Sequence, residues 1–479
     1  MPLITPVEVL PAEQLGAVHF IAIGGAGMSG IAQLFLDRGQ AVSGSDQADS
    51  PALNQLRERG ASVFVGHAAE QLGAAETVVV SSAIRESNVE LARARSLGLR
   101  IYHRSAALAS LMIGHRGVAV TGTHGKTTTS AMIAHALTVA GADPSYVIGS
   151  PLALTGSSAH TGRGPAFVVE ADESDGSFRQ YPAQVVVVTN IEADHLDNWI
   201  TEEAYAEGFV ELASASQVEL VVLSADDPGT VALARRLASK AVKVVTFGTE
   251  PAADVRLIDL EFEGTTATAR LVAGDFSGPL RLSVPGRYNL LNAAAAFVVG
   301  RELGIGAAEL LAAAATFGGT HRRFEHTATA AGVRIYDDYA HHPTEVSATL
   351  AAARTAAGKG RVVACFQPHL FTRTRDLSAE FGAALALADR IVVLDIYPAR
   401  EDPIPGITGR LVAEAATALA GSDQVSYIAD KDNGAEALAD IVRPGDLVLT
   451  IGAGDVHLLG PALARLLQLR MPRAGARAD

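Results

Sequence analysis

The chain has 479 residues, enough for two to four domains that each bury a core of their own. Its formal net charge of -14, with five lysines among 38 basic residues, excludes the basic stripe of a protein that binds nucleic acid or anionic membranes. A single cysteine, Cys365, excludes an internal disulfide framework.

The N-terminal segment, MPLITPVEVLPAEQ, has no basic start followed by an apolar core, so it does not read as a secretory signal. No apolar run in the chain reaches the length of a membrane span. The scarcity of cysteine is typical of a reducing compartment. We therefore expect a cytoplasmic enzyme that binds neither nucleic acid nor membrane and is a monomer or a weak homodimer.

The first predicted unit is a strand, a glycine turn and a helix. Val18–Ile23 reads as the strand, Ile31–Asp37 continues as the helix, and between them G-x-G-x-x-G is formed by Gly25, Gly27 and Gly30. Such a turn binds a diphosphate at the helix N-terminus, in a dinucleotide or a nucleotide sugar, or it only packs the helix on the strand. In a dinucleotide site, Asp46 would contact a ribose hydroxyl.

The same domain continues with two predicted strands, Ala61–Val65 and Thr77–Val80. The second strand is followed by the residues SSAI, which include Ser82. Open α/β sheets bind their ligands at the carboxyl ends of the strands, so we expect these serines in a binding site. We end this first domain at residue 112.

Val118–Ser130, with the sequence VAVTGTHGKTTTS, predicts a strand, a phosphate loop and a helix. Glycine N–H groups approach phosphate closely, Lys126 reaches the β and γ oxygens, and Thr127 can hold magnesium, so the pattern predicts ATP. The usual first glycine of such loops is replaced by Val120, and a plain turn with a solvated lysine is the alternative. The predicted nucleotide contacts are Gly122, Thr123, His124, Gly125, Lys126, Thr127 and Thr128.

An acidic loop follows the predicted strand Phe167–Val169. Its sequence EADESD places four carboxylates together, and they would repel one another unless a cation or hydrogen-bond donors compensate them: Glu170, Asp172, Glu173 and Asp175. Magnesium on the phosphates of ATP is the candidate cation. The next strand, Val185–Val188, leads into NIEADHLD, and a parallel sheet would place His195 beside the acidic loop. A capping or core histidine is the alternative.

Residues 253–284 alternate apolar and polar side chains between glycine turns, which predicts a small antiparallel meander. Beyond it, Asn289 and Asn292 lie on one face at a helix start. Their amides either read an adenine or cap the helix. We end the central domain at residue 325.

The last third predicts a third parallel sheet, with strands at 333–336, 361–366, 391–396, 425–428 and 446–451. After its first strand, DDYAHHPTE gathers titratable groups in one loop, which indicates a site. Its two histidines could ligate a metal, but adjacent side chains diverge, which favours contact with phosphate or carboxylate. After its second strand, FQPHLFTRTRD supplies a clamp for a carboxylate, formed by His369, Arg373 and Arg375.

Eight ordered motifs make the chain resemble the cytoplasmic Mur ligase family over almost its whole length, and most closely the alanine-adding branch. They are HFIAIGGAGMSG, SSAI, TGTHGKTTT, EADESDGSF, NIEADHLD, GTHRRFE, DDYAHHPTE and FQPH. The resemblance implies three α/β domains: a Rossmann-like domain for UDP-N-acetylmuramate (1–112), a P-loop domain for ATP (113–325) and a Rossmann-like domain for the amino acid (326–479). It implies an ATP-dependent amide ligase that adds L-alanine through an acyl phosphate, in peptidoglycan precursor synthesis.

The resemblance also implies roles for single residues. Lys126 would bind the β and γ phosphates, Thr127 and Glu170 would hold one magnesium ion, and His195 would help to hold a second. The implied ADP contacts are Asn289, Asn292, Arg323 and Asp338. The implied alanine site, with further catalytic residues, holds His342, His369 and Arg373. The implied UDP-sugar contacts are Gly25, Gly27, Met28, Ser29, Ser45, Asp46 and Ser82.

The chain departs from the family pattern in three places, one of which is Leu370, where some relatives have a basic residue. Tyr288 stands where a histidine is frequent, and no lysine occurs between Lys126 and Lys240, where sister ligases outside the alanine-adding branch carry a modified one. Three other functions remain open on the residues: a muropeptide ligase that joins a tripeptide to the same UDP sugar, an NAD-dependent dehydrogenase that uses the first glycine turn and Asp46, and a non-catalytic P-loop module.

Overall fold

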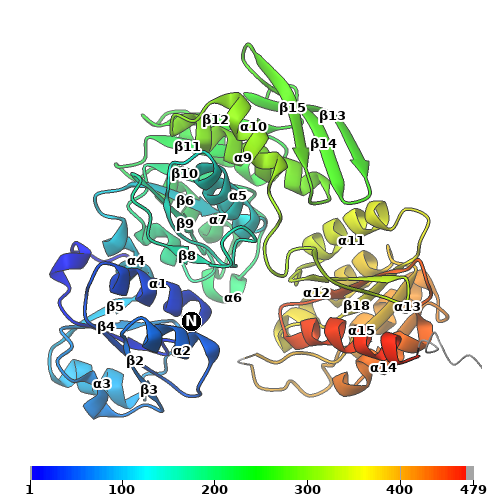
Figure 1. The fold of residues 1–479 in the computed structure, drawn as a ribbon, viewed down its shortest axis with the longest axis horizontal. Helices are drawn as coiled ribbons and strands as arrows, with labels where there is room; N and C mark the ends of the chain where they lie inside the picture. Colours follow the sequence, from blue (N-terminus) through cyan, green and yellow to red (C-terminus); the bar gives the residue numbers. More distant parts are fainter. Residues whose placement is uncertain (1–2, 400, 471–479) are drawn as a thin grey trace, which may run out of the picture. The chain divides into compact units, whose positions relative to one another are not determined.

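The computed structural model describes residues 3–399 and 401–470 and contains three sheets with helices packed on them (Figure 1). The predicted fold of three consecutive α/β domains is confirmed. The chain divides into two compact units. The first holds the described residues up to Ile258 with Arg270–Pro279 and Leu291–Ala314, and the second holds Asp259–Ala269, Leu280–Leu290 and the described residues from Ala315 onward.

The N-terminal sheet has five parallel strands in the order β3-β2-β1-β4-β5. Its strands are β1 (Val18–Ile21), β2 (Val42–Asp46), β3 (Ser62–Val65), β4 (Thr77–Val80) and β5 (Arg100–His103). Its helices are α1 (Ala26–Asp37), α2 (Pro51–Glu58), α3 (Val89–Ser96) and α4 (Arg104–Met112). The strand order reverses between β1 and β4, so the glycine turn and the SSAI segment both leave the sheet at its switch point, where such folds bind ligands.

The first strand is shorter than the sequence predicts. We expected it to reach Ile23, but it ends at Ile21 because Ala22 has a φ of 63°, which lies outside the extended region. The helix α1 then begins at Ala26 with Gly25 as its N-cap. The G-x-G-x-x-G segment therefore begins at the N-cap of the helix, and its last glycine, Gly30, lies in the second turn.

The central sheet has ten strands in the order β15-β14-β13-β12-β11-β10-β6-β9-β7-β8. Its strands are β6 (Arg116–Thr121), β7 (Ser145–Val147), β8 (Ala159–His160), β9 (Ala166–Glu170), β10 (Val185–Val188), β11 (Leu220–Ser224), β12 (Lys243–Gly248), β13 (Val255–Glu263), β14 (Thr266–Ala273) and β15 (Phe276–Leu282). Its helices are α5 (Lys126–Val139), α6 (Leu196–Trp199), α7 (Glu202–Ala213), α8 (Pro228–Leu237), α9 (Arg287–Glu302) and α10 (Ala307–Ala315).

Parallel pairing in this sheet positions the site. Strand β6 lies between β9 and β10, and in register Glu170 is opposite Val120 while Val188 is opposite Thr121. The phosphate loop, the acidic loop and the NIEADHLD loop therefore leave the same edge of the sheet. Two-residue turns join β13, β14 and β15, which are neighbours in the sheet and so form the predicted antiparallel meander (Figure 1).

The C-terminal sheet has six strands in the order β16-β17-β21-β18-β19-β20. Its strands are β16 (Glu325–Ala330), β17 (Val333–Asp338), β18 (Val362–Phe366), β19 (Arg390–Leu394), β20 (Val425–Ile428) and β21 (Leu447–Ile451). Its helices are α11 (Pro343–Ala357), α12 (Phe371–Leu385), α13 (Arg410–Ala420), α14 (Gly434–Ile441) and α15 (Leu459–Arg470). Strands β17 to β21 are parallel, as predicted, and β16 adds an antiparallel edge. Asp338 and Phe366 both lie opposite Ile451, so two of the loops with titratable residues start at one edge.

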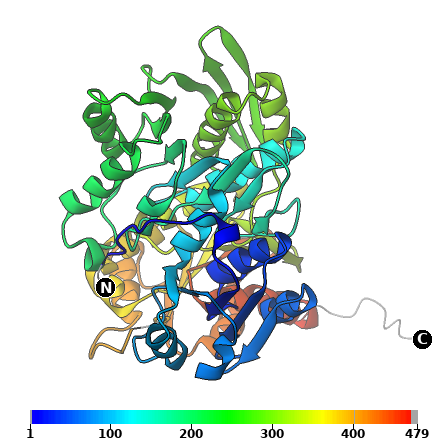
Figure 2. The same ribbon diagram turned by 90° about the vertical axis from the view of Figure 1, so that its left-hand side faces the viewer.

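A continuous apolar core joins the N-terminal and central sheets. It includes Phe20 of the first sheet, Ala107 of helix α4, which is buried from Ser105 to Met112, and Phe167 of the second sheet. The N-terminal segment runs along the central domain, where Ile4 N–H donates to Asp175 O at 2.8 Å and Val7 N–H to Gln180 Oε1 at 2.8 Å (dark blue in Figure 2).

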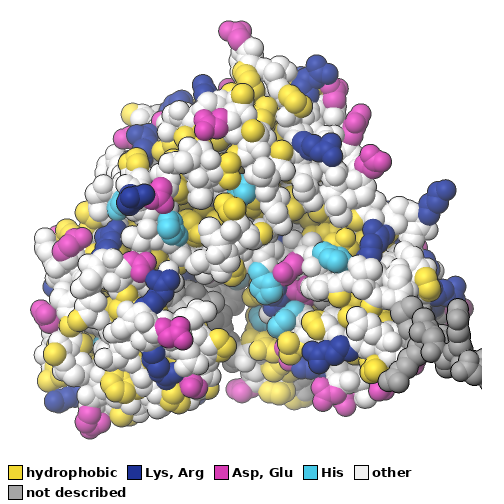
Figure 3. Space-filling view, viewed as in Figure 1, with side chains coloured by type: hydrophobic (Ala, Val, Ile, Leu, Met, Phe, Trp, Pro, Cys, Tyr) yellow, Lys and Arg dark blue, Asp and Glu magenta, His cyan; other side chains and the backbone are white. Residues whose placement is uncertain are grey.

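The surface carries charges of both signs. On the face drawn in Figure 3, acidic and basic side chains are interspersed rather than sorted into large patches. Within the described ranges, the chain contains no helix that combines the length and the apolar character needed to cross a membrane.

Candidate active site

The phosphate loop between β6 and α5 depends on two glycines. Gly122 has a φ of 124° and Gly125 a φ of 83°, values that other residues rarely adopt. A Cβ atom on Gly122 would lie 2.2 Å from Thr189 Oγ1, and one on Gly125 would lie 3.0 Å from Asn292 Oδ1. The loop can follow this path only with glycine at both positions. It delivers the chain to the N-terminus of α5, where an anion is favoured.

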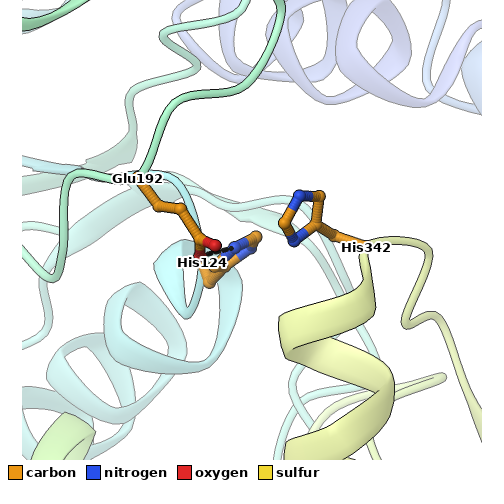
Figure 4. Close-up of side chains that lie close together, drawn as sticks. All are labelled: His124, Glu192 and His342. Atoms are coloured by element: carbon orange, nitrogen blue, oxygen red, sulfur yellow. Dashed lines mark hydrogen bonds and ion pairs between the residues drawn. The ribbon is translucent and has the colours of Figure 1, made fainter. Parts of the chain in front are cut away.

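The loop is held by the segment that follows β10. His124 N–H donates to Asn190 Oδ1 at 2.8 Å, and Thr189 Oγ1 donates to His124 O at 2.5 Å. Thr123 Oγ1 donates to Glu192 O at 2.8 Å, and the His124 ring approaches the same residue, with Nε2 3.0 Å from Glu192 Oε2 (Figure 4). These bonds fix the shape of the loop independently of any ligand.

Lys126 is the first residue of α5, and its side chain is only 16% exposed. Its ammonium donates hydrogen bonds to Gly122 O, Thr123 O and Glu173 Oε1 at 2.8, 3.0 and 3.1 Å. The alternative of a solvated lysine on a plain turn is therefore wrong. The neighbouring Thr128 is also buried, as the second residue of the threonine run in α5.

Two carboxylates of the acidic loop face the phosphate loop. Glu173 contacts Lys126, and burial raises the pKa of Glu173 to about 7 although the ammonium opposes this shift. Glu170 Oε1 accepts from Thr127 Oγ1 at 3.0 Å, and Glu170 Oε2 accepts from Gly149 N–H at 2.6 Å. A hydroxyl and a carboxylate in contact are oxygen donors that Mg²⁺ prefers.

The other two carboxylates of the acidic loop face the N-terminal domain. Asp172 Oδ2 pairs with Arg104 Nη2 at 3.3 Å, and Asp175 Oδ2 accepts from Ser82 Oγ at 2.7 Å. Burial acts to raise the pKa of Asp172, but Arg104 and then Lys126 outweigh it and hold the pKa at about 2. The four crowded acids are therefore separated in pairs, each with its own donors.

His195 lies at the start of α6 in the left-handed region, with a φ of 53°. The backbone N–H of His195 donates to Asp194 Oδ1 at 2.7 Å, and the ring Nε2 lies 3.6 Å from Asp194 Oδ2. The predicted parallel sheet is present, so His195 follows a strand that ends at the same edge as the acidic loop.

The first glycine turn lies against a cation. A Cβ atom on Gly27 would lie 3.3 Å from Arg104 Nη1. Gly25 and Gly27 are exposed, Ser29 is half-buried, and Met28 is buried in the core. The turn therefore offers its backbone on the outside while Met28 fixes it from within.

The acid and serine of β2 have partners inside the domain. Asp46 Oδ2 accepts from Gly24 N–H at 2.9 Å, so this carboxylate supports the glycine turn. Ser45 is fully buried and donates to Glu90 Oε2 at 2.5 Å, and His67 Nδ1 lies 3.2 Å from the same oxygen. Neither Glu90 nor His67 was identified from the sequence, because no short motif contains them.

Asn289 and Asn292 lie in the first turns of α9, as predicted, and both are buried. Asn289 Nδ2 donates to Pro285 O at 2.6 Å, which ties the helix start to the segment before it. Asn292 lies at the phosphate loop, next to Gly125. The Asn289 bond is a donation to a carbonyl from within the helix and not a cap, and a nucleotide contact is compatible with the position of Asn292.

Asp338 ends strand β17 in the second unit. Its carboxylate accepts from Phe324 N–H at 2.8 Å and from Ala340 N–H at 2.9 Å. Burial raises the pKa of Asp338 to about 6, and Arg323 opposes this shift. The guanidinium of Arg323 stacks over the Tyr339 ring at 5.3 Å.

The histidines of this unit have different environments. His342 is the N-cap of α11, where its ring accepts from Thr344 N–H at 3.4 Å and Pro343 follows as the first helical residue (Figure 4). Burial lowers the pKa of His341 to about 3, although Glu345 opposes this. The His369 ring lies 6.1 Å from the His341 ring and stacks on Tyr397 at 5.9 Å.

The predicted carboxylate clamp is only partly assembled. Arg373 lies in the first turn of α12, and its charge is close enough to His341 to lower the pKa of that imidazole. Arg375 is half-exposed and pairs with Asp376, with Nε 2.6 Å from Oδ1. Residues two apart on a helix point to different faces, so including Arg375 in the clamp was wrong.

Three sequence models of one family match the chain. They are described as Mur ligase family, catalytic domain (residues 17–116), Mur ligase middle domain (residues 120–300) and Mur ligase, glutamate ligase domain (residues 322–454). Among curated proteins, a UDP-N-acetylmuramate–L-alanine ligase of Cutibacterium acnes is 60% identical over 470 residues, which is 98% of this chain and 99% of that protein. The ligase of the same name from Kineococcus radiotolerans is 55% identical over 473 residues, or 97% of this chain and 99% of that protein.

Solved structures are similar along most of the chain. A UDP-N-acetylmuramate-alanine ligase from Thermotoga maritima has a TM-score of 0.80 at 28% identity and covers 95% of this chain and 100% of its own. A murein peptide ligase from Psychrobacter arcticus has a TM-score of 0.69 at 23% identity, with 95% of this chain and 100% of its own covered, and shares the fold.

Proposed function

The chain belongs to the Mur ligase family, and from that premise we propose that it joins L-alanine to UDP-N-acetylmuramate in an ATP-dependent reaction of peptidoglycan precursor synthesis. The observation that carries this is the 60% identity over 470 residues with a ligase of that name. A dehydrogenase would leave the Lys126 loop unexplained, and a binding module would hold ATP at that loop without substrate-dependent phosphate release. The muropeptide ligase remains the second candidate, because its fold is also shared.

The chemistry follows from the poor reactivity of a carboxylate as an acyl donor. A muramate carboxylate oxygen attacks the γ-phosphorus of ATP, the bond to ADP breaks, and an acyl phosphate forms. The alanine amine then attacks the acyl carbon, a tetrahedral intermediate collapses, and inorganic phosphate leaves with the oxygen that attacked phosphorus. Positioning and neutralisation of charge supply most of the rate in such transfers.

We assign ATP to the phosphate loop. Gly122 and Gly125, with φ values of 124° and 83°, bring the loop to the N-terminus of α5, and Lys126 places a positive charge against that loop. The further nucleotide contacts that we propose are Thr123, His124, Thr127, Thr128, Asn289, Asn292, Arg323 and Asp338.

Magnesium fits the same place. Thr127 Oγ1 and Glu170 Oε1 are 3.0 Å apart and are both hard oxygen donors, so they would hold one ion, with His195 as a candidate for a second. The ion would neutralise phosphate charge during transfer. The protein's own part is to hold the two oxygens at the edge of the sheet, with Gly149 N–H fixing the carboxylate.

We assign the UDP sugar to the domain of residues 1–112, ATP to that of 113–325 and the amino acid to that of 326–479. The proposed UDP-sugar contacts are Gly25, Gly27, Met28, Ser29, Ser45, Asp46 and Ser82. The proposed amino-acid contacts are His342, His369 and Arg373. We also propose a cytoplasmic enzyme that acts as a monomer or a weak homodimer.

Phosphate release tests the proposal. Purified protein with ATP, Mg²⁺ and UDP-N-acetylmuramate should release phosphate only when L-alanine is added, and the product should gain the mass of one alanine residue. Release that depends on a tripeptide instead would establish the muropeptide ligase. ATP binding without substrate-dependent release would leave only the binding module.

A further inference from the structure

The contact between Lys126 and Glu173 uses every donor of the lysine. An ammonium has three N–H donors, and the three hydrogen bonds to Gly122 O, Thr123 O and Glu173 Oε1 account for all of them. The second carboxylate oxygen of Glu173 also lies 2.9 Å from Nζ. Lys126 can therefore bind a phosphate oxygen only if it gives up one of these partners.

Glu173 is fixed in this position from several sides. Its side chain has no exposed surface, and Trp199 Nε1 donates to its carbonyl oxygen at 2.9 Å. Trp199 is itself buried, with edge-to-face contacts to Phe178 and Tyr205. The backbone of Glu173 is thus held in place, and its carboxylate is enclosed by protein beside Lys126.

The Glu173 carboxylate and a nucleotide phosphate are both anions and would compete for Lys126. A fixed carboxylate near a nucleotide phosphate repels it, while both attract the same ammonium. The shift of the pKa of Glu173 to about 7 shows that its charge is costly in this environment even beside Lys126. Nucleotide binding must therefore overcome an existing ion pair.

We propose that Glu173 is a positioning residue that holds the Lys126 ammonium against its own loop and competes with nucleotide phosphates for it. The inference rests on the proposed function only in taking ATP as the ligand of the loop. The role of Glu173 is to lower the affinity for nucleotide and so to return Lys126 to its own loop when products leave.

The test measures binding of a non-hydrolysable ATP analogue, with an imido bridge between the β and γ phosphorus atoms, by calorimetry on the full chain with Mg²⁺ at pH 8, where the Glu173 carboxyl is mostly ionised. We expect Glu173→Gln to tighten the Kd about threefold to tenfold, because the amide keeps the shape and removes the competing charge. In Lys126→Met, the buried Glu173 carboxyl is neutralised by protonation. Adding Glu173→Gln to that variant should then change little.

The matched control is Glu302→Gln. Glu302 also bonds a lysine, with Lys243 Nζ 3.2 Å from Oε2, but it lies in α9 away from the phosphate loop. Its Kd should equal that of the wild type. If Glu173→Gln does not fold, Glu173→Asp moves the carboxylate ~1.5 Å back and should tighten binding by a smaller factor.

Two results would overturn the inference. One is an unchanged or weaker Kd in a Glu173→Gln protein of unchanged melting temperature, or a weaker Kd in Glu173→Asp. The other is an equal gain from Glu173→Gln with and without Lys126. Failure of the wild type to bind the analogue would instead refute the assignment of ATP to the loop.

Discussion

Arg104 and Asp172 form an ion pair, with Nη2 3.3 Å from Oδ2, that joins the first glycine turn to the acidic loop. Arg104 lies beside Gly27 on one side and pairs with the acidic loop on the other. The same loop bonds Lys126 through Glu173. A substitution at the first glycine turn would therefore affect Arg104, which contacts both the turn and the acidic loop of the central domain.

Gly27→Val should raise the KM for UDP-N-acetylmuramate at least tenfold while changing the KM for ATP much less. The added Cβ would lie 3.3 Å from Arg104 Nη1, and the rest of the side chain would cover the turn where a diphosphate is expected. The matched control is Gly306→Val, where a Cβ has only ordinary contacts at 3.7 and 3.8 Å. Equal increases in both constants would place the UDP sugar elsewhere.

Lys126→Met should reduce ligation to background. The ammonium lies against the loop, where it donates to Gly122 O and Thr123 O, and charge neutralisation dominates phosphoryl transfer. The variant should keep its secondary structure by circular dichroism, but it should lose some stability because a buried carboxylate loses its partner. Near-normal phosphate release would refute the assignment of ATP to this loop.

Arg373→Ala should weaken the binding of L-alanine by roughly 1.5 to 3 kcal/mol, the range for a hydrogen bond to a charged group. Arg373→Lys should recover only part of this, because an ammonium lacks the bidentate fork of a guanidinium. Positional isotope exchange in labelled ATP, measured with the UDP sugar but without alanine, should survive. Loss of exchange together with alanine dependence would show that Arg373 serves the phosphates instead.

His341 should make the protein sensitive to mild acid. Burial lowers its pKa in the folded protein to about 3, below the ordinary value of 6.5. The unfolded chain then binds one more proton between these values, so the free energy of unfolding falls as pH falls below 6.5, by up to about 1.4 kcal/mol per unit. Urea unfolding from pH 7.5 to 5 should show a shallower decline for His341→Gln. Parallel curves would contradict the buried neutral imidazole.

The sequence predicts most of the fold because the strands are periodic and strongly apolar. Val185–Val188 is a strand with all four side chains buried, as its β-branched run indicates. Errors occur where one backbone angle decides the boundary. Ala22 ends β1 early with a φ of 63°, and nothing in its residue type announces this.

The site is predicted less completely, because partners come from distant segments. The four carboxylates of EADESD indicated that cations or hydrogen-bond donors must lie near them. The sequence did not show that Arg104 pairs with Asp172 and that Lys126 pairs with Glu173. Arg375 fails for a simpler reason, since α12 begins before it and turns it to another face. Glu90 has no local signal at all, because its partners Ser45 and His67 come from other parts of the domain.

The most direct test of the acyl phosphate uses UDP-N-acetylmuramate with oxygen-18 in its carboxylate. The protein, ATP, Mg²⁺ and L-alanine are added, and the released phosphate is analysed by mass spectrometry. We expect one labelled oxygen in each phosphate released, because the carboxylate oxygen that attacks phosphorus leaves with it. Unlabelled phosphate alongside amide formation, or label in a released nucleotide monophosphate, would contradict it.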